Sequence, residues 1–441
     1  MAEPELADLL RADRAHLVHP NLPLGEGAEV VFVRGEGVWL HDAAGRAYLD
    51  ARSQLNCVNL GYGHPRLVRA ISEQAATLAY CAIFYSFSHP QAIRCAERLA
   101  ALTPGDLDHL FFTSGGSEAI EAALSLARLY FARRGSGKVK VVSRYLGYHG
   151  NTAAAMSATG MPMAGSDRIQ QLVPGHVHID PPYAYRMAGG LDPEAYARRC
   201  ADDLARTIER EGPETVAAFL AEPVLGVGGY IAPPPGYWPL VREVCDAYDV
   251  LLVLDEVMTG FLRTGRMFAC EHWGVVPDLL VLGKGIDSSY VPCGAVAFGS
   301  RVMDVVRGAA WSGFTSSAHP LAMAAVNAAL DAYAEDGVAE NVAAVGELVR
   351  ARLAEELAAL PCIGEVDGLG LMLGIELVAD RASRAPLAPE VVARIGPAAL
   401  ERGLLTRGRG SRMAFCPPLV ITPAEAELAL DRLHDALRAA L

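Results

Sequence analysis

The middle of the chain alternates between short apolar runs and helix-like stretches, and this alternation limits the folds open to it. Between about residues 65 and 330, the runs have the length and aliphatic character of buried strands. The expected strands are 110–113, 139–143, 216–221, 250–254, 279–282 and 294–298. The stretch 118–133 carries its apolar residues on one helical face. The pattern predicts an α/β fold with a doubly wound, mainly parallel sheet, in which ligands bind at the carboxyl ends of the strands.

The two ends of the chain follow other patterns. Residues 29–50 predict three short strands, with turns near 35–37 and 42–46. Amphipathic helices at about 337–359, 388–402 and 423–439 surround a predicted strand at 370–377. We therefore expect a large domain over 65–330 and a smaller α+β domain over 331–441, to which an N-terminal segment, 1–64, contributes.

Composition excludes several classes of function. The 441 residues are 52% hydrophobic and 20% charged, which is typical of a globular enzyme with a large core. A net charge of −13 argues against nucleic acid and anionic membranes as partners, and no apolar stretch approaches the ~20 residues of a membrane span. Nine cysteines without zinc-type spacing indicate reduced thiols and no metal site. Residues 1–6 lack a signal-peptide pattern, so the expected location is cytoplasmic.

Lysine is almost absent, which draws attention to where it occurs. Lys138, Lys140 and Lys284 are the only lysines among 38 basic residues. Lys284 follows the apolar run 279–282, and Asp255 follows the run 250–254. A desolvated lysine, unlike arginine, can lose its proton and form a Schiff base. Pyridoxal phosphate needs such an amine and a carboxylate for its ring nitrogen. A buried structural ion pair explains these two residues alone equally well.

A glycine-rich turn follows the first predicted strand of the large domain. Residues 110–113 run into Ser114-Gly115-Gly116-Ser117-Glu118 and then a helix. Glycines let the backbone approach an anion, and a helix N-terminus offers free N–H groups and a positive dipole end. As a single motif this is weak, because most such turns are ordinary strand–helix connections. Neither G-K-[ST] nor G-x-G-x-x-G occurs, so Walker and Rossmann sites lack support.

Several motifs in order make a specific combination. They are Ser114–Ala119, Tyr148-His149-Gly150, Ala221-Glu222-Pro223, Asp255–Phe261, Gly283-Lys284-Gly285, Gly313-Phe314-Thr315 and Arg407 before Pro417-Pro418. This series resembles the class III aminotransferases, subgroup II of the fold-type I pyridoxal-phosphate enzymes, and its ω-transaminase-like branch in particular. The resemblance covers nearly the whole chain, from Arg34 to Thr422. It implies the fold-type I architecture with pyridoxal 5'-phosphate as cofactor.

The resemblance implies a role for each motif residue. Lys284 forms the Schiff base and shuttles the substrate proton, Asp255 keeps the ring nitrogen protonated, and Tyr148 stacks on the ring. Thr315 reaches the phosphate of the neighbouring subunit, which implies a homodimer with shared active sites. The cofactor-binding residues implied are Gly116, Ser117, Tyr148, His149, Glu222, Asp255, Val257, Met258, Lys284 and Thr315. Met258 departs from many relatives, which carry a glutamine that can bond the ring hydroxyl.

Substrate residues are expected around the same site. Glu222 and Arg407 resemble the family's switch pair, in which the arginine clamps a keto-acid carboxylate and swings away for an uncharged substrate. Arg409 and Arg412 lie near Arg407, so proximity alone does not single it out. Asn56 stands where many ω-transaminases have tryptophan, which favours a polar substrate. The aromatic segment around Phe84 and Tyr85 is expected to form another wall.

These expectations converge on an aminotransferase. We expect it to move an amino group between a small-molecule amine or amino acid and a keto or aldehyde acceptor by a ping-pong cycle. The donor hypothesis is a polar, amino-sugar-like amine of natural-product biosynthesis, from Asn56 and the acidic balance. An epimerase or decarboxylase on the same scaffold is the alternative. A catalytically silent binding protein is disfavoured because Lys284 and Asp255 are both present.

Overall fold

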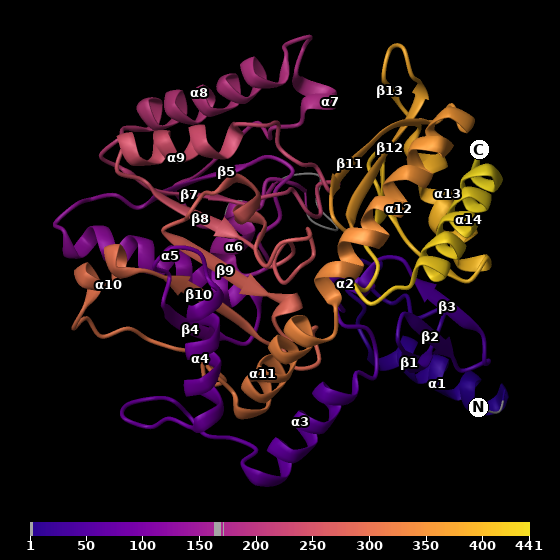
Figure 1. Cartoon of the computed structure of the whole chain (residues 1–441), viewed down its shortest axis with the longest axis horizontal. Helices are drawn as coiled ribbons and strands as arrows, with labels where there is room; N and C mark the ends of the chain where they lie inside the picture. The colour runs from indigo at the N-terminus through magenta and orange to yellow at the C-terminus, as the bar shows by residue number, and fades with distance from the viewer. Residues whose placement is uncertain (1–2, 163–168, 171) are drawn as a thin grey trace.

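A seven-stranded sheet forms the centre of the larger part of the molecule (Figure 1). The computed structural model describes residues 3–162, 169–170 and 172–441. Residues 1 and 2, which belong to the N-terminal stretch predicted to lack a signal peptide, lie outside the described residues. The strand order is β4-β10-β9-β8-β7-β5-β6. In chain order the strands are β4 (His109–Thr113), β5 (Lys140–Arg144), β6 (His176–Ile179), β7 (Val216–Ala221), β8 (Leu251–Asp255), β9 (Leu279–Gly283) and β10 (Gly294–Phe298).

The sheet is mainly parallel, as the sequence predicted. The pairs β5–β6, β5–β7, β7–β8 and β8–β9 are parallel, whereas β10 runs antiparallel to both β9 and β4. All six predicted strands occur, each within one residue of its predicted bounds. The prediction missed β6, because its sequence His-Val-His-Ile carries two polar residues and is short.

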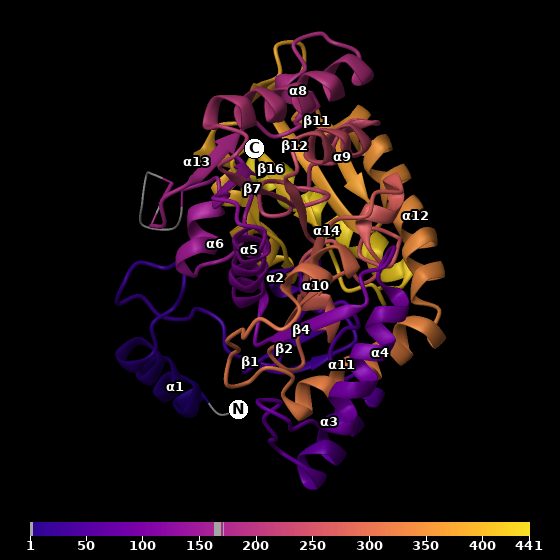
Figure 2. The ribbon, with the colours of Figure 1, turned by 90° about the vertical axis from the view of Figure 1, so that its left-hand side faces the viewer.

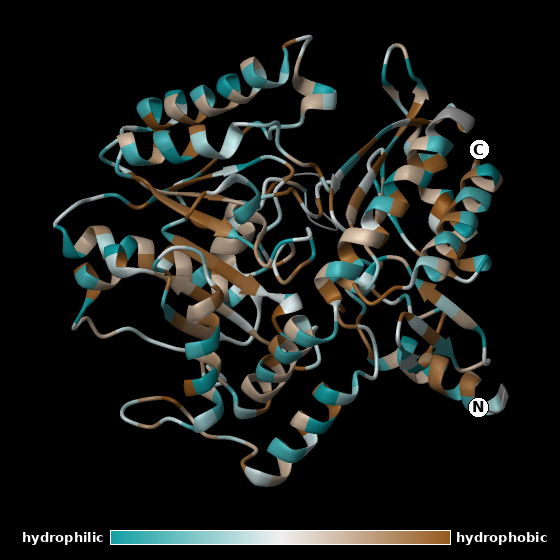
Figure 3. Cartoon of the chain, in the orientation of Figure 1, coloured by the Kyte–Doolittle hydropathy of each residue, from teal (hydrophilic) through white to brown (hydrophobic). Residues whose placement is uncertain are grey.

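Helices cover both faces of this sheet, because alternate strand residues point to opposite sides. Leu252 and Leu254 of β8 belong to the core beneath α8 (Pro193–Glu211) and α9 (Tyr237–Ala247). Leu251 and Val253 belong to the core beneath α5 (Gly116–Arg133). The strands accordingly appear as apolar ribbons inside amphipathic helices (Figure 3). The predicted face of α5 is confirmed as buried: Ile120, Ala123, Leu124, Ala127 and Phe131. The fold is therefore the expected doubly wound α/β type.

A four-stranded sheet joins the start of the chain to its C-terminal part. Its order is β1 (Phe32–Glu36), β2 (Trp39–Asp42), β3 (Ala47–Asp50) and β14 (Leu404–Leu405), with β14 parallel to β3. The predicted turn at 35–37 was too wide, since Gly35 and Glu36 still pair with β2. Only Gly37 of the three has a positive φ, +57°, which a tight turn requires.

A third sheet and three helices build the C-terminal part of the chain. Its order is β11 (Ile363–Leu369), β12 (Met372–Asp380), β16 (Arg412–Phe415) and β15 (Gly408–Arg409), and β13 (Ala385–Pro386) pairs with β12. The helices are α12 (Val338–Ala359), α13 (Pro389–Glu401) and α14 (Pro423–Ala440). The predicted strand 370–377 is found as β12, which begins two residues later, because Gly370, with φ +57°, forms the turn between β11 and β12. The domain boundaries at 64 and 330 stay predictions, which the β3–β14 pairing supports.

The remaining helices connect these layers. They are α1 (Glu3–His16), α2 (Ser53–Asn56), α3 (Pro65–Thr77), α4 (Pro90–Leu102), α6 (Ala153–Ala158), α7 (Ala184–Met187), α10 (Ser300–Val306) and α11 (Pro320–Glu335), with 3-10 turns η1 (Ala269–Trp273) and η2 (Lys284–Ile286). Helix α1 lies at the edge of the molecule, away from the large sheet (Figure 2). Every helix among the described residues is too short or too polar to cross a bilayer.

One buried arginine connects three parts of the chain. Arg263 is fully buried, and its Nη1 donates to the carbonyl oxygens of Leu371 (3.0 Å) and Pro417 (2.6 Å). Its Nη2 donates to Ser53 Oγ (3.1 Å) and Asn59 Oδ1 (2.9 Å). A buried acceptor without a donor costs about 1–3 kcal/mol. Arg263 therefore holds the N-terminal and C-terminal parts against the loop that follows β8.

We expect Arg263→Met to lower the thermal unfolding midpoint by about 5 °C or more, because it leaves four buried acceptors unpaired. Differential scanning calorimetry measures the shift. Arg266→Met is the matched control, because Arg266 is exposed three residues further along. Equal midpoints for the two variants would contradict this role for Arg263.

Candidate active site

A cavity of about 160 Å³ opens where β8 and β9 end. The residues lining it are Gly116, Ser117, Tyr148, His149, Gly150, Glu222, Asp255, Val257, Met258 and Lys284. Nine of the ten residues expected to bind the cofactor are in this set, and only Thr315 is outside it. Gly150 was not among them, although the Tyr148-His149-Gly150 motif was a signal for it. Segments far apart in sequence thus meet at the carboxyl ends of the central strands.

Asp255 is buried and firmly oriented at the end of β8. Its Oδ2 lies 2.8 Å from His149 Nδ1, and its Oδ1 accepts from the backbone N–H of Val257 at 3.1 Å. The backbone N–H of His149 is itself 3.0 Å from Thr159 Oγ1, an acceptor that fixes this segment. The Asp255 and His149 side chains are only 5% and 1% exposed. A buried carboxylate held in this way has one fixed direction in which to meet a ligand.

Lys284 directly follows the last residue of β9, and its backbone is left-handed, with φ +46°. Such a conformation is strained in a non-glycine residue, and it is a recurrent feature of functional sites. Burial lowers the pKa of its amine, while the nearby Cys57, Asp255 and Glu222 act in the opposite direction. Among the described residues, no hydrogen bond or ion pair involves its Nζ. The amine is therefore available to a ligand.

The turn at the start of α5 forms one wall of the cavity. A Cβ on Gly116 would lie 3.0 Å from Val257 Cγ1, so glycine is needed for this close approach. Gly150 has φ +126°, and a Cβ there would lie 2.3 Å from Ser117 Oγ. Ser117 Oγ accepts from the N–H of Asn151 at 3.1 Å. The free N–H groups at the start of this 18-residue helix give the wall a positive end that suits an anion.

Glu222 closes the other side of the cavity. Its Oε1 accepts from the N–H of Tyr148 at 2.9 Å, and its Oε2 accepts from the N–H of Gly226 at 2.5 Å. Burial raises the pKa of Glu222, and the nearby His149 acts in the opposite direction. Burial also raises the pKa of Tyr148. Met258 packs beside Gly226, where a Cβ would lie 2.5 Å from the Met258 sulfur.

Thr315, Phe84 and Tyr85 gather away from this cavity. The Tyr80 hydroxyl donates to the Thr315 carbonyl at 2.9 Å, and Phe84 packs beside Gly313. Thr315 is exposed, and Tyr85 is 96% exposed. We call residues 84–87 and 313–315 the aromatic rim. Within one chain the aromatic rim does not line the cavity that holds Lys284.

Asn56 and Arg407 also lie outside the cavity lining. Asn56 is buried, and its Oδ1 accepts from the Tyr230 hydroxyl at 2.5 Å. Arg407 is exposed between β14 and β15. Among the described residues no hydrogen bond or ion pair joins it to Glu222. Their roles toward a substrate stay predictions.

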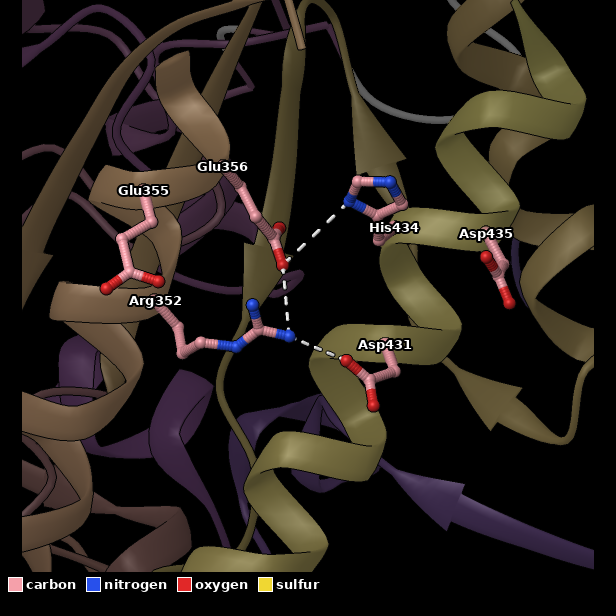
Figure 4. Close-up of a pocket in the computed structure, with 6 residues that line it drawn as sticks. All are labelled: Arg352, Glu355, Glu356, Asp431, His434 and Asp435. Atoms are coloured by element: carbon pink, nitrogen blue, oxygen red, sulfur yellow. Dashed lines mark hydrogen bonds and ion pairs between the residues drawn. The ribbon is translucent and has the colours of Figure 1, made fainter. Parts of the chain in front are cut away.

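A second cavity, of about 540 Å³, lies between α12 and α14 (Figure 4). Its lining is charged: Arg352, Glu355, Glu356, Asp431, His434 and Asp435. Arg352 Nη2 lies 2.6 Å from Asp431 Oδ1 and 3.7 Å from Glu356 Oε1. The contact with Asp431 joins the two helices, whereas the contact with Glu356 lies within α12, and none of the predicted site residues lies here. The candidate active site is therefore the smaller cavity at the sheet edge.

The cavity at the sheet edge fits pyridoxal phosphate by its chemistry. It combines an uncommitted lysine amine, an oriented buried carboxylate and a glycine cradle at a helix N-terminus. Lys284 would take the aldehyde, Asp255 the ring nitrogen, and the turn at Gly116 and Ser117 the phosphate. These are the three anchoring groups that the cofactor requires.

Comparison with known proteins points to one family. Residues 25–437 match the family Aminotransferase class-III. A probable aminotransferase of Mycobacterium tuberculosis is 41% identical over 422 residues, which is 93% of this chain and 89% of that protein.

Solved structures show the same similarity. The (S)-enantioselective omega-transaminase of Thermomicrobium roseum has a TM-score of 0.94 at 41% identity and covers 99% of both chains. The omega-transaminase of Pseudomonas jessenii in complex with PMP has a TM-score of 0.94 at 36% identity and covers 98% of both chains. Both likenesses extend over the large sheet and the C-terminal part together.

His149 offers a test of the carboxylate's orientation. We expect His149→Ala to raise the dissociation constant for pyridoxal phosphate about tenfold or more, because Asp255 loses a charged hydrogen bond. His149→Asn should keep most of the affinity, since its amide nitrogen can take the position of Nδ1. Equilibrium dialysis measures both constants. Wild-type affinity in the alanine variant would show that Asp255 needs no such support.

Proposed function

The chain belongs to the class III aminotransferases, which depend on pyridoxal phosphate, and from that premise we propose a ping-pong aminotransferase. It transfers an amino group from a primary amine or amino acid to a keto or aldehyde acceptor. The observation that carries this proposal is the pair Asp255 and Lys284 on one cavity with the glycine cradle. Among the described residues the Lys284 amine has no protein partner, and it lines the same cavity as the buried Asp255 carboxylate. This arrangement suits Schiff-base chemistry better than a structural ion pair does.

Asp255 and Lys284 have complementary tasks in this proposal. When bound, pyridoxal phosphate accepts the donor's amino group and withdraws electrons from the carbon that loses its proton. Asp255 keeps a proton on the ring nitrogen, because His149 and Val257 hold the carboxylate in a buried, fixed position. Lys284 takes the proton from the substrate carbon and returns it. Its lowered pKa favours the neutral amine that this task needs.

The other cavity residues bind and orient the cofactor. The N–H groups at Gly116 and Ser117 would hold the phosphate at the start of α5. Tyr148 and Val257 would pack against the ring, and Glu222 fixes the Tyr148 backbone. Met258 supplies apolar contact in place of a hydrogen-bond donor.

A homodimer with shared active sites completes the site. In support of this, Thr315 and Tyr85 are exposed, Phe84 is partly exposed, and all three lie outside their own chain's cavity. They would reach the cavity of the neighbouring subunit. Large exposed aromatic side chains such as Tyr85 and Phe87, which is 66% exposed, are typical of interfaces. Thr315 would then contact the phosphate at the start of the partner's α5.

The donor is a polar amine of the amino-sugar type, and the enzyme works in the cytoplasm. Asn56 is the residue on which the polar-donor part rests, and its amide oxygen accepts from the Tyr230 hydroxyl. All nine cysteines are free, which suits a reducing compartment.

Transfer of labelled nitrogen tests the function directly. The purified holoenzyme is incubated with 15N-labelled amine donors and a 2-oxo acid, and the products are analysed by mass spectrometry. The proposal expects 15N in the amino acid formed from the acceptor. Exchange of the donor's carbon-bound hydrogen without nitrogen transfer would instead indicate an epimerase, and release of carbon dioxide would indicate a decarboxylase.

Arg407→Ala should raise KM for a 2-oxo acid acceptor far more than KM for an amine donor that lacks a carboxylate. A charged hydrogen-bonded contact contributes about 1.5–3 kcal/mol, which corresponds to about a tenfold or larger change in affinity. Steady-state kinetics with each substrate varied in turn measure the two constants. A similar rise in both KM values would show that Arg407 acts through folding and not through the acceptor's carboxylate.

A further inference from the structure

A tight loop follows β7 and contacts a residue of the candidate active site. We call residues 225–231 the β7 loop. The N–H groups of Leu225 and Ile231 each donate to the other's carbonyl oxygen, at 3.0 and 3.1 Å, and close the loop at its base. Near its start, the N–H of Gly226 donates to Glu222 Oε2 at 2.5 Å. The position of the β7 loop therefore decides where the Glu222 carboxylate lies.

The β7 loop also packs against two other segments near the cavity. A Cβ on Gly228 would lie 2.4 Å from the carbonyl oxygen of Leu146, which lies two residues before Tyr148. The Tyr230 hydroxyl donates to Asn56 Oδ1 at 2.5 Å. Because these neighbours are already in close contact, a shift of the loop would have to move them as well.

Arg412 of β16 holds the β7 loop from the C-terminal part of the chain. It is 4% exposed, and its Nε donates to the carbonyl oxygen of Gly229 at 2.6 Å. Among the described residues, only Arg412 donates to this buried carbonyl. Gly229 has φ +130°, and a Cβ there would lie 2.5 Å from Arg412 Cδ, so glycine is needed under the arginine. The N–H of Gly229 donates to the Gly226 carbonyl at 2.9 Å, which connects the arginine to the start of the loop.

On its other side, Arg412 belongs to a buried polar network. Its Nη1 donates to the Tyr183 hydroxyl oxygen and to Glu376 Oε2, each at 3.1 Å. Glu376 is fully buried and also accepts from Ser411 Oγ at 2.6 Å and from Arg186 Nε at 3.1 Å. Glu376 therefore keeps other donors when Arg412 is replaced. Buried ion pairs add little stability over well-packed apolar residues, so the orientation of Nε explains this pair better than stability does.

Strand β12 closes the remaining space around the guanidinium. Gly374 of β12 pairs with Ala414 of β16. A Cβ on Gly374 would lie 2.2 Å from the Gly229 carbonyl oxygen and 2.6 Å from Arg412 Nη2. Among the described residues, Nη2 is buried without a hydrogen-bond partner, so the guanidinium is bound through Nε and Nη1. The C-terminal sheet is thus shaped to receive the Gly229 carbonyl at one point.

We propose that Arg412 is a positioning residue for the cofactor site. Arg412 fixes the β7 loop through Gly229. The loop fixes Glu222, whose Oε1 accepts from the N–H of Tyr148 at 2.9 Å. The C-terminal sheet is thereby connected to one wall of the cavity. The inference rests on the proposed function only in that pyridoxal phosphate binds in this cavity, and it does not depend on which reaction follows.

Two arginines share Glu376, and they supply a matched pair of variants. Arg412→Met removes the donor to Gly229, whereas Arg186→Gln removes a residue whose hydrogen bonds go to Glu376 and Arg384. In the holoenzyme, amide hydrogen exchange of the peptide covering 225–231 should be about tenfold or more faster in Arg412→Met, while exchange in α14 stays at the wild-type rate. The dissociation constant for pyridoxal phosphate, measured by equilibrium dialysis, should rise about fivefold or more in the same variant. Arg186→Gln should leave both quantities within about twofold of wild type.

Arg412→Lys covers the case in which Arg412→Met fails to fold. It keeps a cation beside Glu376 but lacks Nε, so the β7 loop should loosen and the affinity should fall by smaller factors than in Arg412→Met. Wild-type exchange and affinity in the Arg412 variants would overturn the proposal, and so would equal changes in Arg186→Gln. Neither measurement requires amino transfer. An enzyme that transfers no amino group but responds as stated would contradict the proposed function and keep this role for Arg412.

Discussion

The parallel pairing of β8 with β9 is the constraint on which the rest of the site depends. Asp255 stands opposite Val281 in that ladder, and the N–H of Glu256 donates to the Val281 carbonyl at 2.9 Å, so the register is fixed at the strand ends. Lys284 follows three residues after Val281. A slip of one residue would turn these side chains to the opposite faces of the sheet. The chemistry is therefore set by backbone hydrogen bonds and by the apolar packing of both strands.

Burial then gives each ionisable group its character. In the same buried cavity, burial lowers the pKa of the Lys284 amine and raises the pKa of Glu222. The Asp255 carboxylate is instead held by two donors from the surrounding chain, His149 and Val257. An amine that loses its proton readily and an oriented carboxylate are suited to opposite tasks. Segments separated by more than a hundred residues must pack together before these differences arise.

Local pattern predicted six strands of the large sheet, and with them the positions of Asp255 and Lys284 at strand ends, because the apolar runs before these two residues are fully buried strands. Features that depend on tertiary contact were beyond it. The antiparallel direction of β10 and the order of strands have no local signature. The bond from Tyr230 to Asn56 spans 174 residues, so the burial of Asn56 could not be foreseen. The role proposed for the aromatic rim depends on a second subunit, which a local pattern does not describe. Gly150 could have been found, because its motif was already recognised.

The most direct measurement is the site of covalent attachment of the cofactor. Holoenzyme is treated with borohydride, which fixes pyridoxal phosphate to its lysine, and the digested protein is analysed by mass spectrometry. Lys138, Lys140 and Lys284 are the only lysines of the chain that could be modified. The amines of Lys138 and Lys140 donate to carbonyl or carboxylate oxygens of residues that precede β7 and β8, at the opposite end of these strands from the cavity. The account predicts the pyridoxyl label on the peptide that contains Lys284. A label on Lys138 or Lys140, or none on Lys284, would contradict it.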